Sequence, residues 1–255
     1  MLDNYVVTYN CIVSIFISLG SCQMEPFIIG GDYTDITQYP HAVFLLMDCV
    51  QMFICGGSIV TNRIILTAAH CLFECNVKRN RIIVKYGHQT LDYMKSQDAK
   101  KYIIHDSYND MNLHYDIALI HLITTLDLGD YVKRVAILKN FPKNLAYAYV
   151  AGWGVINSQS DTASTLRHVY QKIPPQNECQ MLGSWPKGVL CTGSANAAEY
   201  PEQGDSGSAL VVSKYIQIGV VTFKHPTLGY VGYTNTTYFY KWIVRTTKKL
   251  TCGIK

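Results

Sequence analysis

Three short strings in this sequence carry residue types that could perform nucleophilic catalysis. They are Thr67-Ala-Ala-His70-Cys71, Asp116-Ile-Ala-Leu119 and Gly204-Asp205-Ser206-Gly207. A serine hydroxyl is a weak nucleophile at neutral pH, and an imidazole base oriented by a carboxylate can activate it. Each string alone also has a structural explanation, as a histidine after a strand, an aspartate cap or a tight glycine turn. Together, His70, Asp116 and Ser206 favour acyl transfer.

The elements that must position these residues are mostly short β-strands. Their apolar, turn-bounded runs are Ala42 to Leu46, Gly57 to Leu66, Arg81 to Tyr86, Tyr102 to His105, Ile117 to Leu122, Ala148 to Ala151, Ala209 to Val212 and Ile216 to Phe223. Many short strands separated by turns predict an all-β sandwich or a pair of barrels. Residues 238–250 differ, because their apolar residues recur at near-helical spacing and end in two lysines, which suit a helix C-terminus. We expect an all-β fold with one C-terminal α-helix.

Composition limits the class of protein. The chain has 255 residues, of which 49% are hydrophobic and 16% are charged, so it can fill a core and does not resemble a disordered chain. The formal net charge of +4 is spread without a dense Lys/Arg tract, which argues against binding to nucleic acid. No apolar run reaches the length of about 18 residues that a membrane-spanning helix needs, so we expect no membrane association.

The cysteines and the N-terminus indicate secretion. The nine cysteines form no paired CxxC pattern, so disulfides are favoured over a zinc site. An apolar run at residues 11–19, followed by Gly20 and Ser21, predicts a signal peptide at 1–21 and a short propeptide at 22–27. The alternative is a short buried N-terminal segment. Secretion would place the cysteines in an oxidising compartment.

Two further signals are less specific. His105, His114 and His121 suggest a metal site, but ordinary structural histidines are the favoured interpretation, and we expect no metal and no cofactor. Asn235-Thr236-Thr237 is an N-glycosylation sequon, and an unmodified asparagine is the alternative.

In this order, the three strings resemble the chymotrypsin-like serine proteases. The resemblance covers residues 28–255 through four more strings: Ile28-Ile-Gly-Gly31, Cys55-Gly-Gly-Ser58, Gly152-Trp-Gly154 and Tyr240-Lys-Trp242-Ile243. It implies two six-stranded antiparallel β-barrels, at 28–135 and 136–237, with the active site between them and a C-terminal helix in 238–255.

The resemblance also implies roles for individual residues. His70 would be the general base, Asp116 the carboxylate that orients it, and Ser206 the nucleophile. The backbone amides of Gly204 and Ser206 would form the oxyanion hole. Cleavage before Ile28 would free an amine that pairs with Asp205 and shapes this hole. Phe27 stands where the family commonly has Lys or Arg, so we do not expect a tryptic activator.

Disulfides follow in part from the same resemblance. It implies bridges between Cys55 and Cys71 and between Cys179 and Cys191. Cys49 and Cys75 flank the first of these bridges symmetrically in sequence, so we predict a third bridge between them. Cys252 is left over, either free or intermolecular.

The departures from the family concentrate on the primary specificity pocket. We assign this pocket to five residues, which are Tyr200, Thr222, Phe223, Lys224 and Gly232. Tyr200 stands at the position of the pocket base, where an inward ring would fill the space for a substrate side chain. Glu202 replaces a cysteine of the family, and no cysteine between 191 and 252 could be its partner. Lys224 replaces a glycine at the pocket mouth.

These departures resemble mite group 3 allergen-type proteases, and within them the inactivated protease paralogues of the scabies mite. That resemblance implies a secreted protein that binds host defence proteins, notably complement components. We therefore expect a protease homologue with an intact triad and an obstructed pocket that acts by binding a macromolecular partner. The first alternative is an active serine endopeptidase that cleaves protein substrates after small residues. The second is a purely structural or allergenic protein.

Overall fold

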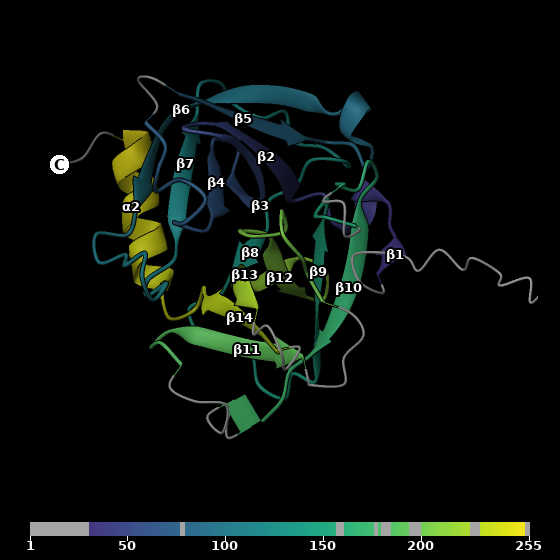
Figure 1. Ribbon diagram of the computed structural model, residues 1–255, viewed down its shortest axis with the longest axis vertical. Helices are drawn as coiled ribbons and strands as arrows, with labels where there is room; N and C mark the ends of the chain where they lie inside the picture. The colour runs from purple at the N-terminus through teal and green to yellow at the C-terminus, as the bar shows by residue number, and fades with distance from the viewer. Residues whose placement is uncertain are drawn as a thin grey trace, which may run out of the picture.

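The computed structural model describes residues 31–76, 80–156, 161–175, 178–179, 185–193, 200–224 and 230–252. The expected signal peptide, the expected propeptide and Ile28 lie outside these residues. The described chain forms two β-structures, one above the other in Figure 1, with one α-helix along one side. No helix in the described residues is long and apolar enough to cross a bilayer.

The upper β-structure is a closed six-stranded barrel. Its strands are β2 (Ala42–Asp48), β3 (Met52–Thr61), β4 (Ile64–Thr67), β5 (Arg81–Tyr86), β6 (Lys95–Ile104) and β7 (Ala118–Leu122). They pair antiparallel in the order β2-β3-β4-β7-β6-β5, and β5 pairs back onto β2. The interior holds fully buried side chains such as Leu45, Ile65 and Leu119. Closure leaves the sheet without an unpaired edge.

The lower β-structure is one curved sheet of eight strands. They are β1 (Asp32–Tyr33), β8 (Ala136–Ile137), β9 (Tyr147–Gly152), β10 (Arg167–Lys172), β11 (Val189–Gly193), β12 (Ala209–Val212), β13 (Ile216–Lys224) and β14 (Tyr230–Asn235). The order is β1-β10-β9-β12-β13-β14-β11, and β8 pairs parallel with β13. Two 3₁₀ turns, Ile36–Gln38 and Leu91–Tyr93, complete the connections.

In the part of the chain that the structure describes, the lower sheet does not close into the second six-stranded barrel that the family resemblance implies. In the described residues β10 and β11 lie next to each other without backbone pairing. The buried side chains of Gln171 on β10 and Thr192 on β11 join them instead, since Thr192 Oγ1 donates to Gln171 Oε1 at 3.1 Å. At its other end β10 pairs with β1, so backbone donors there are already used.

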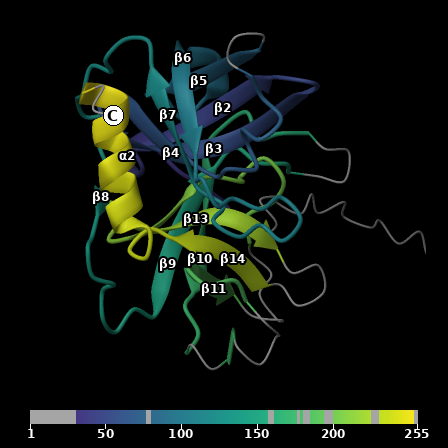
Figure 2. The ribbon, with the colours of Figure 1, turned by 90° about the vertical axis from the view of Figure 1, so that its left-hand side faces the viewer.

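The predicted C-terminal helix is α2 (Tyr240–Cys252), which starts two residues later than the pattern suggests. Asn235 Oδ1 accepts from the amides of Thr237 and Tyr238, and this turn precedes the helix. Trp242, Ile243, Thr246 and Leu250 are buried at three- and four-residue intervals, so one face of α2 is apolar. That face packs beside the upper barrel, and the first turn of α2 follows β14 of the lower sheet (Figure 2).

Candidate active site

Strand pairing brings the histidine and the aspartate together. His70 follows β4 and Asp116 precedes β7, and these strands pair with Thr67 opposite Ala118. Asp116 Oδ2 lies 2.8 Å from His70 Nδ1, and Asp116 Oδ1 accepts from the backbone amide of His70 at 2.8 Å. An ionised carboxylate only accepts hydrogen bonds, so Nδ1 carries the proton and Nε2 is left as the basic nitrogen.

Asp116 also joins the two β-structures. Its side chain is fully buried, and its carbonyl accepts from Thr234 Oγ1 of β14 at 2.8 Å. Burial opposes the charged form of His70, but the charge and hydrogen bond of Asp116 act in the other direction, and the net effect is a raised pKa of His70. The pair is thus arranged to hold an imidazolium once a proton arrives.

The loop around Ser206 is fixed by backbone contacts with both β-structures. The Ser206 carbonyl accepts from the amide of Gly56 on β3 at 2.7 Å, and the amide of Gly207 donates to Val221 on β13 at 2.8 Å. Gly204 and Gly207 have φ angles of +93° and +84°, a region in which side chains are strained. A Cβ on Gly207 would also collide with Thr67 and with the carbonyl of Gly56.

Ser206, His70 and Gly204 line one open cleft of about 500 Å³ between the two β-structures. Its other lining residues come from β2, from the first half of β3, which includes Cys55, and from positions 155, 162 and 203. The structure therefore brings the predicted base, nucleophile and oxyanion-hole residue to the same solvent-accessible space.

Asp205, next to the nucleophile, is buried beneath this cleft. It accepts from the amide of Gly154 at 2.9 Å and from the amide of Glu202 at 3.1 Å. A side chain on Gly152 or Gly154 would collide with its carboxylate, so both glycines are needed here. Burial raises the pKa of Asp205 to about 7. The expected cation for this carboxylate, the amine of Ile28, lies outside the described residues.

A second, smaller pocket of about 160 Å³ opens beside Ser206. It has the position of the predicted specificity pocket, and its lining residues are Pro201, Glu202, Gln203, Ser206, Val221, Thr222, Phe223, Lys224 and Val231. The Tyr200 ring is half-buried against the core of the lower sheet, and Lys224 Nζ lies 3.5 Å from the centre of that ring. Lys224 Nζ also forms an ion pair with Glu202 Oε1.

Val231 stands in the wall of this pocket, which the sequence analysis assigned to Gly232. Successive residues of a strand face opposite sides, and here Val231 faces the pocket while Gly232 lies under the ring of Phe223. The ring of Phe223 also stacks on Trp185, with 5.3 Å between ring centres.

Three disulfides join the cysteines that were expected to pair. They are Cys49–Cys75, Cys55–Cys71 and Cys179–Cys191. The Cys55–Cys71 bridge ties β3 to the turn that carries His70, so it supports the cleft directly. Cys252 is free and exposed on α2.

The three histidines that the sequence analysis considered for a metal site, His105, His114 and His121, do not form a group of potential ligands in the described residues. His105 stacks on Tyr115 with 4.8 Å between ring centres, and His121 is buried on β7. In the part of the chain that the structure describes, Cys55, His70 and Cys71 are the one group of potential metal ligands within reach of each other, and both sulfurs are already in a disulfide.

Comparison with known proteins agrees with this geometry. Rat kallikrein-8 is 32% identical over 213 residues, which cover 78% of this chain and 79% of the relative. The solved structure of HL collagenase has a TM-score of 0.76 at 26% identity, over 88% of this chain and 98% of that one. The scabies mite inactivated protease paralogue S-D1 has the same fold, with a TM-score of 0.76 at 24% identity over 89% of this chain and 98% of its own. The family model called Trypsin matches residues 28–243, and the chain therefore belongs to the trypsin family of serine proteases.

Proposed function

We propose that the protein is a secreted serine endopeptidase that hydrolyses peptide bonds after small residues. The observation that carries this proposal is that Ser206 lines both the cleft that is shared with His70, the partner of Asp116, and the 160 Å³ pocket. Membership of the trypsin family supports protein substrates, and its disulfides suit an oxidising compartment.

The reaction follows from the residue types. Ser206 Oγ attacks the substrate carbonyl, and its proton passes to His70 Nε2 while Asp116 stabilises the imidazolium. The carbonyl oxygen becomes an oxyanion that accepts hydrogen bonds from the amides of Gly204 and Ser206. His70 then gives the proton to the leaving amine, and water releases the acyl group by the same steps in reverse order.

The size of the pocket supports small residues before the cleaved bond. A volume of about 160 Å³ is close to the apolar cavity of about 150 Å³ that holds one benzene ring. That volume is an upper limit, because the side chains of Phe223 and Val231 and the ion pair of Lys224 with Glu202 all line the same space, so we expect an alanine or valine side chain to fit best.

Fluorophosphonate labelling tests the machinery without requiring a deep pocket. Protein processed to begin at Ile28 should gain one label per chain by intact mass, and the Ser206→Ala variant should gain none. A peptide series that varies only the residue before the cleaved bond should then give the highest kcat/KM for Ala and Val. An unlabelled but folded wild type would contradict the proposal.

A second candidate is a protease homologue without proteolysis that binds host defence proteins of the complement type. The observation that favours it is the ion pair of Lys224 and Glu202, two residues that line the pocket. The scabies mite paralogue of the same fold is described as inactivated. Absent labelling together with saturable binding to a purified complement component would support this candidate.

A further inference from the structure

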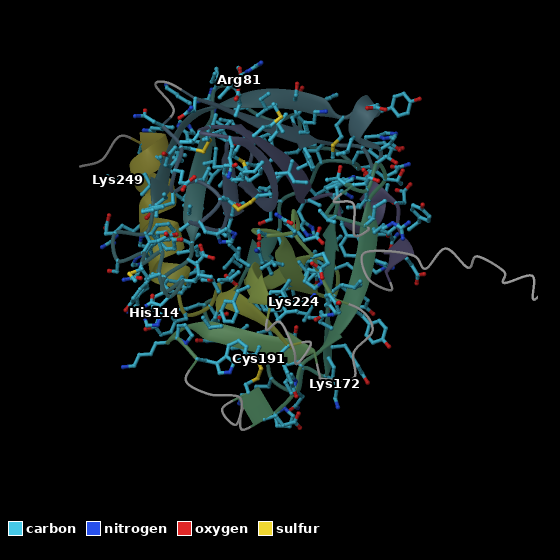
Figure 3. The ribbon with its side chains drawn as sticks, viewed as in Figure 1. Arg81, His114, Lys172, Cys191, Lys224 and Lys249 are labelled. Atoms are coloured by element: carbon cyan, nitrogen blue, oxygen red, sulfur yellow. A yellow bond between two sulfur atoms is a disulfide. The ribbon has the colours of Figure 1, made fainter. Side chains whose placement is uncertain are left out.

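Lys224 turns its ammonium group into the molecule rather than toward bulk water. The side chain is 27% exposed, whereas that of Arg81 is 63% exposed; Figure 3 labels both residues. It leaves the end of β13 and reaches the carboxylate of Glu202 and the face of Tyr200. This position is beside Ser206, where a substrate side chain would enter.

The two groups around this ammonium make a cation-binding site. Glu202 Oε1 pairs with Lys224 Nζ, while Glu202 Oε2 accepts from the amide of Gln203 at 3.3 Å. The Tyr200 ring presents its face at 3.5 Å from Nζ, within the distance at which a ring attracts a cation. Both the carboxylate and the ring are partly shielded from water, which strengthens such contacts.

We propose that Glu202 and Tyr200 form a subsite for a basic side chain or small organic cation, and that Lys224 occupies it as an internal ligand. The ligand class follows from the carboxylate, which suits an ammonium, guanidinium or amidinium group, and from the flat ring beneath it. The small-residue preference then results from Lys224, because its side chain takes up part of the space that a larger substrate side chain would need.

The consequence for substrates rests on the proposed endopeptidase function, whereas cation binding itself does not. An internal ligand competes at an effective concentration in the millimolar range, so a free cation binds weakly while Lys224 is present. Removal of the Lys224 side chain leaves the charge of Glu202 without a partner and opens the space that the lysine filled.

The experiment is a calorimetric titration with benzamidine, an aromatic amidinium, of full-length processed protein. We expect Lys224→Ala to bind at least about tenfold more tightly than wild type, because the internal competitor is gone. The double variant Lys224→Ala/Glu202→Gln should lose this gain. Lys214→Ala is the matched control, because Lys214 is an exposed lysine that contacts Gln38 and not the pocket, and it should bind as wild type does.

A second measurement uses the wild type and does not depend on the stability of a variant. Benzamidine that displaces Lys224 should increase acetylation of this lysine by an amine-reactive reagent, by mass spectrometry, and leave Lys214 unchanged. Equal benzamidine affinity of wild type and folded Lys224→Ala, or unchanged acetylation at saturating benzamidine, would overturn the proposal.

The outcome separates this inference from the proposed function. Benzamidine binding to a protein that fluorophosphonate does not label would keep the subsite and reject the endopeptidase. Labelling of Ser206 without any gain of benzamidine affinity in Lys224→Ala would keep the endopeptidase and reject the subsite.

Discussion

The buried charge of Asp205 should make the stability of the unprocessed protein depend on pH. Burial raises the pKa of this carboxyl from 3.8 to about 7 in the folded state. The unfolded chain therefore loses the proton first, and ionisation favours unfolding as the pH rises from about 4 to 7. Above pH 7 both states are ionised, and the destabilisation reaches a constant value.

The substitution Asp205→Asn removes this charge at nearly constant shape. A difference of about 3 pKa units corresponds to roughly 4 kcal/mol at 1.36 kcal/mol per unit. The amide group can accept from only one of the two backbone donors, Gly154 and Glu202, which costs about 1 kcal/mol. We expect Asp205→Asn to be about 3 kcal/mol more stable at pH 8 and about 1 kcal/mol less stable at pH 4.

Urea denaturation followed by tryptophan fluorescence, at pH 4 to 8, measures these free energies of unfolding. The chain that retains residues before Ile28 should show the gain at pH 8. The processed chain should show a loss at the same pH, because the expected amine of Ile28 then loses its carboxylate. An Asp205→Asn variant of the unprocessed chain that is no more stable than its parent at pH 8 would refute the reasoning.

Three other variants test the cleft, the pocket and the framework. Stopped-flow labelling measures the rate of Ser206 acylation. This rate should fall with decreasing pH through a pKa above the ordinary 6.5 of histidine, because the pKa of His70 is raised. Asp116→Asn should lower the same rate by about 10⁴. Val231→Ala should raise kcat/KM about tenfold for peptides with leucine before the cleaved bond, because it widens the pocket wall; an unchanged preference would place Val231 outside the substrate's path. Replacing Cys49 and Cys75 by serine opens a loop of 26 residues and should lower the free energy of unfolding by about 3.5 kcal/mol in urea, with labelling of the folded protein retained.

Local patterns were sufficient where neighbouring residues decide the structure. The apolar face of α2 is visible in the spacing of Trp242, Ile243 and Leu250. Only the last three residues of strand β6 were predicted, because its first part, Lys95 to Lys101, is mostly polar. It is a strand because β5 and β7 supply partners on both sides, and those partners are distant in sequence.

The sequence by itself determined the chemistry that the cleft can perform, because a hydroxyl, an imidazole and a carboxylate are properties of residue types. It also determined the family, through strings whose residues are adjacent in the chain. Only the tertiary structure decided the character of the pocket. Whether Val231 or Gly232 faces it depends on strand register, and a shift of one residue exchanges the two faces of a strand. The contact of Lys224 with Glu202 and Tyr200 joins the end of β13 to a segment more than 20 residues earlier in the chain, so no local pattern could reveal it.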